Sequence, residues 1–414
     1  MRKRILSAVL MSMLGVAAFC EENKVDVSFY GFVSNQMYWQ DRTEYQTSDG
    51  LLNFMPMDVK KNDIDEDMNY GWNSSMLSIL TRLGCRLNGP DVLGARTMAL
   101  FESDFSTASM TMFMRQAYIR FDWDRDRVTF GQTGHPMCTD LMPGTINIAI
   151  GSPFNALNRS PMLRYDHYFG EDKGLCLTGA AIYQFLSGSC AGPGPDGKSF
   201  KYHRNSNLPE LWAALSAQAG GFSAELGFDW LQLKPRTEDP LTGHKVNEHI
   251  NQWAAMLQMS YNAGKLSLRA KTTYGYNLTH LNMVSGYGVS KINADGSYEY
   301  APLKTSSSWV FASYGRTWRA GLLFGYTKNL GADKDLVDPN DKNLFWVYSG
   351  DVRNFDSAYR ICPQLEYISG SFALGLEYEI TTVAYGNTIA KNGSVSDTHN
   401  VTNNRVMLTA KYSF

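Results

Sequence analysis

The stretch NRVMLTAKYSF (404–414) alternates apolar and polar side chains along its whole length. Its even-numbered residues from Val406 onward are apolar, whereas the odd-numbered ones include Arg405 and Lys411. Successive side chains of a β-strand point to opposite faces of the sheet, so the stretch is predicted to be a strand with one apolar and one polar face. The segment FALGLEYEI (372–380) repeats this pattern and places two carboxylates on its polar face.

The same alternation predicts sixteen strands in all. They lie near residues 25–39, 75–87, 95–105, 111–123, 128–136, 162–169, 174–185, 209–219, 222–234, 250–262, 265–278, 306–316, 319–329, 357–368, 371–385 and 404–414. Tight turns such as Gly220-Gly221 follow the even-numbered strands, and long polar connections such as 40–74 and 137–161 follow most odd-numbered ones. Short turns on one side and long loops on the other are typical of a transmembrane antiparallel β-barrel of the all-β class.

A soluble β-sandwich also alternates, with its apolar face turned to a core. Two features favour the barrel: charged residues recur on the polar faces, and aromatic residues collect towards the ends of the apolar faces, as at membrane interfaces. An open sheet edge would leave backbone groups unpaired in hydrocarbon, so the sheet must close. A closed barrel of about sixteen strands is too wide for side chains to fill, which predicts a water channel.

The chain begins with the cations of 2–4 and an uncharged apolar run over 5–19, which predicts a cleaved secretory signal peptide at 1–20 and a single barrel domain at 21–414. A lipid-anchored Cys20 is the competing interpretation. Removal of the signal peptide leaves 35 Lys and Arg against 40 Asp and Glu, a balance that gives no indication of a nucleic-acid partner.

No metal, cofactor or disulfide framework is predicted. The five remaining cysteines are an odd number without paired spacing, although one bridge between Cys138 and Cys190 stays open. Asp63, Asp65 and Asp67 have a spacing that could ligate Ca²⁺, but they lack the glycine and terminal glutamate of an EF-hand, so a solvated acidic surface is the better interpretation. The histidines show no zinc-binding spacing, and no nucleophile–base pair can be identified.

Several phrases resemble the Gram-negative porin superfamily, the trimeric general porins and their phosphate- and dicarboxylate-selective relatives. They are TRLGCRLNGP (81–90), ALFESDF (99–105), MRQAYIRFDW (114–123), VTFGQTGHP (128–136) and LTAKYSF (408–414). The resemblance implies a sixteen-stranded barrel in the outer membrane, surrounded by its lipid and usually a homotrimer. It also implies a long loop folded inward and a terminal aromatic residue, here Phe414, that the barrel-assembly machinery reads.

By position, the inward loop would be 137–161, after the fifth strand. The sequence departs here from the general porins, whose loop carries acidic residues facing an arginine ladder. The charged residues of this loop are Asp140 and Arg159, and the remainder is small or apolar, with Asn147 and Asn155 as further constriction candidates.

Alternation directs several charged side chains into the predicted lumen. These are Arg82, Arg86, Arg96, Glu102, Asp104, Arg164 and Asp166. Charged ladders in a narrow zone set the selectivity of channels, and arginine holds carboxylate or phosphate bidentately. The alternative is that these residues only hydrate the lumen and pair with one another.

The sequence therefore predicts an outer-membrane porin for passive diffusion of small hydrophilic solutes or ions, with preference for anions as the finer expectation, and no enzymatic activity. A barrel phospholipase or protease is disfavoured, because those resemble smaller barrels and no catalytic constellation is recognisable. A structural or adhesive barrel that acts through its long extracellular loops remains the alternative function.

Overall fold

The computed structural model describes residues 25–47, 50–106, 111–147, 151–185, 188–194, 197–348 and 352–414. The predicted signal peptide lies outside the described residues. None of the helices within these ranges has the length and apolar character that crossing a membrane requires.

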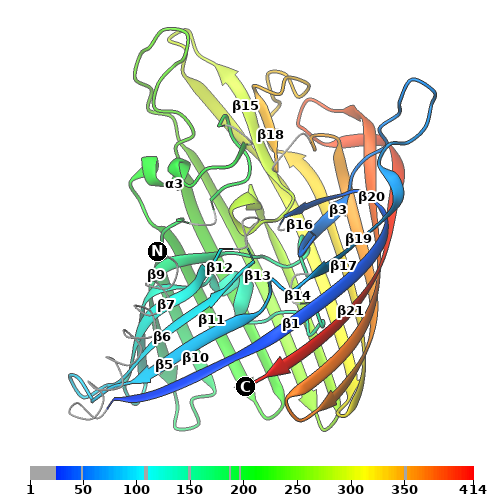
Figure 1. Cartoon of the computed structure of the whole chain (residues 1–414). Coiled ribbons are helices and arrows are strands. Elements are labelled where there is room, and N and C mark those ends of the chain that lie inside the picture. The colour runs from blue at the N-terminus through cyan, green and yellow to red at the C-terminus, as the bar shows by residue number, and fades with distance from the viewer. Residues whose placement is uncertain are drawn as a thin grey trace, which may run out of the picture.

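A closed antiparallel barrel of sixteen strands dominates the structure, which confirms the predicted fold (Figure 1). The wall consists of β1 (Asp26–Arg42), β4 (Tyr70–Leu77), β5 (Arg82–Asn88), β6 (Arg96–Asp104), β7 (Phe113–Asp122), β8 (Asp126–Gly134), β9 (Arg159–Phe169), β10 (Leu175–Ile182), β11 (Glu210–Ala219), β12 (Phe222–Leu233), β13 (Ile250–Ala263), β14 (Leu266–Tyr276), β16 (Tyr298–Gly315), β17 (Trp318–Ala332), β19 (Phe355–Ser369), β20 (Phe372–Ile389) and β21 (Val395–Ser413). β4 and β5 count as one strand of the wall, because both pair with successive halves of β1.

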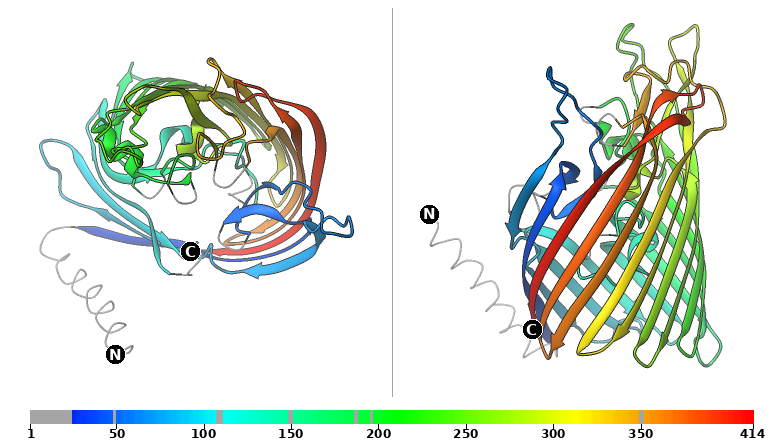
Figure 2. Two further views of the ribbon diagram at one scale, coloured as in Figure 1. Left: turned by 90° about the horizontal axis from the view of Figure 1, so that it is seen from above. Right: turned by 90° about the vertical axis from the view of Figure 1, so that its right-hand side faces the viewer.

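The barrel closes between its first and last strands. β1 pairs with β21 from Phe32 opposite Ser413 to Gln40 opposite Arg405. The two ends of the described chain therefore lie at the short-turn end of the barrel, as Figure 2 shows for the C-terminus. Four of the connections there are two-residue turns, at 220–221, 264–265, 316–317 and 370–371. Gly220 takes a φ of 56° that a side chain would disfavour.

Two strands extend further than the alternation predicted. β16 begins at Tyr298 rather than near 306, and β21 begins at Val395 rather than near 404. The extra residues lie toward the long-loop end, where β16 also pairs with β15 (Gly286–Ile292), which pairs in turn with β18 (Phe345–Val347). Outside hydrocarbon, a strand has no need for one apolar face, so the alternation ends before the strand does.

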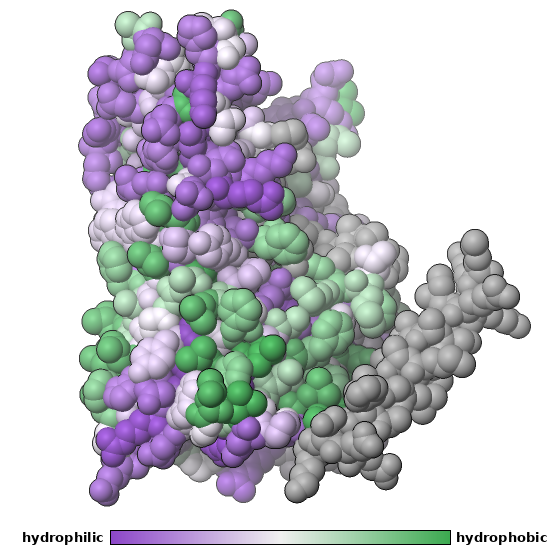
Figure 3. Space-filling view, turned by 90° about the vertical axis from the view of Figure 1, so that its left-hand side faces the viewer, coloured by the Kyte–Doolittle hydropathy of each residue, from purple (hydrophilic) through white to green (hydrophobic). Residues whose placement is uncertain are grey.

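The outer surface of the wall carries the apolar face of each strand. On β12, Leu226 and Phe228 are exposed, whereas Glu225 and Asp229 point inward and are buried. Figure 3 shows apolar side chains gathered in a band on the lower half of the barrel, with polar side chains above and below it. An exposed apolar band of this kind is stable only in contact with the hydrocarbon core of a bilayer.

Within the described ranges, two loops fold into the barrel. The one predicted at 137–161 lies between β8 and β9, at 135–158, because β9 already begins at Arg159. It contains α2 (Pro136–Thr139) and is called the inward loop below. The other was not predicted: β2 (Glu44–Thr47) and β3 (Leu52–Pro56) form a hairpin within the first loop, 43–69, and this hairpin also lies inside the barrel.

The hairpin is buried against the wall by polar and apolar contacts. Asn53 donates to Glu379 over 2.7 Å, and the hydroxyl of Tyr385 donates to the carbonyl of Pro56 over 2.6 Å. Phe54 and Met55 belong to a buried apolar cluster that also contains Phe154 of the inward loop. The short apolar run of β3 therefore finds a core inside the barrel, which explains why a connection predicted to be polar and external turns inward.

Shorter elements complete the structure. α3 (Lys201–Ser206) lies between β10 and β11, and the 3₁₀ turn η2 (Leu278–Leu281) follows β14. Leu278 and Leu281 of η2 pack with Met137 of the inward loop. A third segment is thereby folded against the base of the inward loop.

Candidate functional site: the arginine-lined lumen

The inward loop is pinned to one side of the barrel. Glu377 on β20 accepts hydrogen bonds from the backbone amides of Ile146 (2.7 Å) and Asn147 (3.1 Å). On β14, the Lys271 ammonium donates to the carbonyl of Met137 over 3.0 Å. A buried charge is stable only where such partners satisfy it, so these two side chains serve the loop rather than the solvent.

Further anchors come from the strands between these two. Trp309 on β16 donates to the side-chain oxygen of Asn155 over 3.0 Å, and Arg360 on β19 donates to the carbonyl of Ser152 over 2.7 Å. The loop therefore follows the β14–β20 side of the wall. Open space remains between the loop and the opposite side, β5 to β9.

A cavity of about 290 Å³ occupies this space. Its lining combines five wall strands, β5 to β9, with both inward-folded loops. The lining residues are Leu51, Leu52, Leu80, Arg82, Glu102, Ser106, Arg115, Gln116, Thr133, Gly134, Cys138, Thr139, Met142, Leu157 and Arg159. Three arginines face a single glutamate, and the loops contribute mostly apolar surface.

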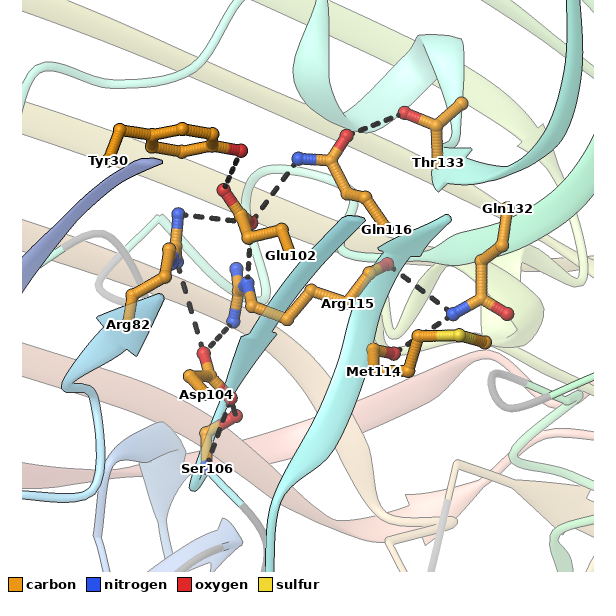
Figure 4. Close-up of polar contacts among 10 residues, drawn as sticks. All are labelled: Tyr30, Arg82, Glu102, Asp104, Ser106, Met114, Arg115, Gln116, Gln132 and Thr133. Atoms are coloured by element: carbon orange, nitrogen blue, oxygen red, sulfur yellow. Dashed lines mark hydrogen bonds and ion pairs between the residues drawn. The ribbon is translucent and has the colours of Figure 1, made fainter. Parts of the chain in front are cut away.

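Two carboxylates hold two of the arginines in place (Figure 4). Glu102 lies 3.2 Å from Nε of Arg115 and 3.4 Å from the nearest guanidinium nitrogen of Arg82. Asp104 pairs closely with Arg115 and lies 3.9 Å from Arg82. Tyr30 donates to the second oxygen of Glu102 over 3.2 Å. The acids are thus saturated by fixed donors, and they orient the guanidinium groups at the cavity wall.

Arg115 was missed by the sequence analysis, and a β-bulge explains why. Ile119 and Ala117 follow the outward face of β7, so strict alternation would place Arg115 towards lipid. The register between β6 and β7 shifts at Glu102, which leaves one extra residue on β7. A bulge re-aims the local side chains, and Arg115 and Gln116 both end in the lumen.

Arg159 differs from the other two arginines. It is the first residue of β9 rather than part of the loop, and it lines the cavity half-buried. Within the described part of the chain, it forms no ion pair or hydrogen bond through its side chain. The cavity therefore carries one guanidinium charge without a counter-ion in addition to the paired ones.

The other predicted pore residues lie outside this cavity. Arg86 and Arg96 are exposed near the short-turn end and have no ion pair among the described residues. Arg164 bridges Asp166 (2.9 Å) and Asp140 (3.0 Å) of the inward loop. Asp140 also lines a second lumen cavity of about 150 Å³.

Three further residues singled out by the sequence analysis lie away from the cavity lining. Asn155 is held by Trp309, as described above, and the Asn147 side chain is buried beside Glu377. The exposed Phe414 exchanges two backbone hydrogen bonds with Gly31 at the barrel seam. These residues shape the loop and the seam rather than the cavity.

The acidic turn of the first loop and the cysteines Cys138 and Cys190 were also candidates for a metal site and a disulfide. Asp67 pairs over 2.8 Å with Arg42 at the end of β1, and Asp65 pairs over 2.7 Å with Lys61 of the same loop, so two of the three carboxylates are neutralised by cations of the chain. Cys138 and Cys190 are free thiols, so the bridge between them does not form. Burial raises the pKa of the Cys138 thiol, which keeps it protonated at neutral pH.

No family model and no curated protein sequence matches the chain. Solved structures do match. The outer-membrane channel DcaP of Acinetobacter baumannii has a TM-score of 0.67 at 20% identity, over 94% of this chain and 97% of that one. An anion-selective porin from Comamonas acidovorans has a TM-score of 0.52 at 11% identity, over 94% and 100%. OmpF of Salmonella typhi in complex with daunomycin has a TM-score of 0.52 at 11% identity, over 94% and 97%. At these identities the likeness establishes that the chain has the fold of outer-membrane porins.

Proposed function

We propose that the protein is an outer-membrane porin, a water-filled channel for passive diffusion of small hydrophilic solutes, with a preference for anions. The observation that carries this proposal is the cavity between the inward loop and the β5–β9 wall, lined by three arginines against one glutamate. A positive field in a narrow passage with low-dielectric walls raises the local concentration of anions and excludes cations.

The selectivity rests mainly on Arg159. Arg82 and Arg115 share Glu102 and Asp104, so their fields are partly cancelled. The unpaired guanidinium of Arg159 is free to meet a carboxylate or phosphate group of a passing solute through two parallel hydrogen bonds.

Single-channel recording of the purified protein in a salt gradient tests the proposal. We expect steady conductance and a reversal potential of the sign for anion preference. Arg159→Ala is expected to move the reversal potential towards that for cations, because it removes the unpaired charge. Arg86→Ala is the matched control, because it removes an exposed arginine that does not line the cavity.

Two outcomes would overturn the proposal at different levels. A protein that forms a folded barrel but conducts no current is not a porin. Equal shifts in Arg159→Ala and Arg86→Ala would leave the channel but refute the assignment of its selectivity to the cavity.

We further propose export by a cleaved signal peptide at 1–20, assembly as a homotrimer and recognition of Phe414 by the barrel-assembly machinery. The fold and the apolar band support an outer-membrane location. N-terminal sequencing of the mature protein, its mass in detergent and the yield of folded barrel after deletion of Phe414 test these three points separately.

A further inference from the structure

Four ionisable side chains meet in a buried cluster away from the arginine-lined cavity. His135 is the N-cap of α2, Glu210 begins β11, Asp229 lies on β12 and His280 lies in η2. Each is at most 1% exposed. One potential ligand atom from each of His135, Glu210 and Asp229 lies within 4.8 Å of the other two. Four segments that are distant in sequence thus converge on one point.

The two carboxylates in this cluster have no arginine or lysine as a counter-ion among the described residues. In this part of the chain, the ionic contacts of Glu210 and Asp229 are only with the two imidazoles. Two buried carboxylates carry a large desolvation cost unless a positive charge compensates them. The cluster therefore has the charge and the ligand types of a divalent cation site.

Three atoms of the cluster are buried and lack a hydrogen-bond partner. They are Oε2 of Glu210, Oδ1 of Asp229 and Nε2 of His280. Nε2 of His280 lies 3.3 Å from Oε1 of Glu210 and 3.6 Å from Oδ2 of Asp229, without a well-directed hydrogen bond to either. Buried polar atoms are nearly always satisfied, so three orphans in one cluster indicate a missing partner.

The two histidines are not equivalent. Nδ1 of His135 accepts a hydrogen bond from the backbone amide of Met137 over 3.1 Å, so its Nε2 carries the proton and donates to Glu210 over 2.8 Å. Nδ1 of His280 has only a long contact, 3.4 Å, with the side-chain amide of Gln252. When Nε2 coordinates a metal ion, the proton of the imidazole ring lies on Nδ1. His280 can adopt this tautomer with the loss of only the long contact to Gln252.

We propose that Glu210, Asp229 and His280 bind one divalent transition-metal ion of the Zn²⁺ class. His135 acts as a positioning residue, because it donates to the Glu210 carboxylate as outer-shell partners of metal ligands do. Mixed carboxylate and imidazole ligands suit Zn²⁺ and its neighbours, whereas Ca²⁺ and Mg²⁺ prefer oxygen ligands alone. The ion would fasten η2 and the base of the inward loop to the wall.

Zn²⁺ binding to the full-length mature protein in detergent, after treatment with EDTA, tests this proposal. We expect one Zn²⁺ per chain by equilibrium dialysis with metal analysis. His280→Ala and Asp229→Asn are expected to abolish stoichiometric binding, and His135→Ala to weaken it about 10- to 100-fold. Glu225→Gln is the matched control, since it neutralises another buried carboxylate of β12 outside the cluster.

The outcomes separate the proposal from its alternatives. Binding that is lost in His280→Ala and Asp229→Asn but retained in Glu225→Gln supports it. Absence of stoichiometric Zn²⁺ binding, binding that survives His280→Ala, or preferential binding of Ca²⁺ overturns it. Each variant is compared only if its unheated form migrates as a folded barrel, and His135→Ala gives an independent graded readout.

Discussion

The attachment of the inward loop to Glu377 gives a sharp test of how the channel is kept narrow. The carboxylate accepts from two backbone amides, over 2.7 and 3.1 Å. Hydrogen bonds to a charged group contribute about 1.5–3 kcal/mol each. Glu377→Gln keeps one acceptor oxygen and replaces the other with a donor, so it should weaken the attachment by about 2 kcal/mol. Glu377→Ala removes both bonds and should weaken it by about 4 kcal/mol.

These energies predict the frequency with which the loop leaves the wall. At about 1.4 kcal/mol per factor of ten, the detached fraction should rise about 30-fold in Glu377→Gln and several hundred-fold in Glu377→Ala. The contacts of Trp309 and Arg360 remain, so the barrel itself should stay folded. We expect larger open-channel current noise and faster proteolysis within the inward loop, in the order Ala, Gln, wild type.

Glu225→Gln controls for the loss of a lumen charge, because Glu225 is hydrogen-bonded to Gln258 rather than to the inward loop. The reasoning would be refuted if Glu377→Ala matched the wild type in both current noise and loop proteolysis. It would also fail if Glu225→Gln produced the same noise, since charge rather than loop attachment would then be responsible.

Two further predictions concern the wall and the first loop. A Cβ on Gly227 would lie 2.0 Å from the Trp212 ring. Gly227→Val should therefore destabilise the barrel by about 1–3 kcal/mol and lower the urea midpoint of unfolding. Gly179 has open space around it, so Gly179→Ala should leave this midpoint unchanged. Burial raises the pKa of the Asp67 carboxyl, but hydrogen bonds from backbone amides and from Arg42 outweigh this effect and lower the pKa from its ordinary value of 3.8. Its pairing therefore stabilises the first loop above about pH 4 and is lost as pH falls further; Asp67→Asn should reproduce at neutral pH the loop proteolysis that the wild type shows in acid.

Most of the barrel wall could be predicted from the chain because the pleat of a strand is a local property. Alternation with a period of two residues assigned the strands, and it directed Arg82, Glu102 and Asp104 to the lumen without knowledge of any neighbour. Turn residues separated short from long connections for the same reason. These signals act over a few residues, so the linear sequence is enough to read them.

The narrow part of the lumen depends on contacts between segments that are far apart in the chain. Arg115 faces the cavity only because the register of β6 and β7 shifts, and alternation along β7 alone indicates the opposite face. The β2–β3 hairpin turns inward because distant strands supply a core for Phe54 and an acceptor for Asn53.

The same distinction applies to the buried cluster. No spacing in the sequence connects His135 with His280, because their proximity arises only when the sheet closes and η2 packs on the inward loop. Local backbone geometry therefore determined the strands and their faces from the sequence alone. Closure of the barrel, which brings remote loops together in an enclosed volume, decided which charges meet, which remain unpaired and how wide the lumen is.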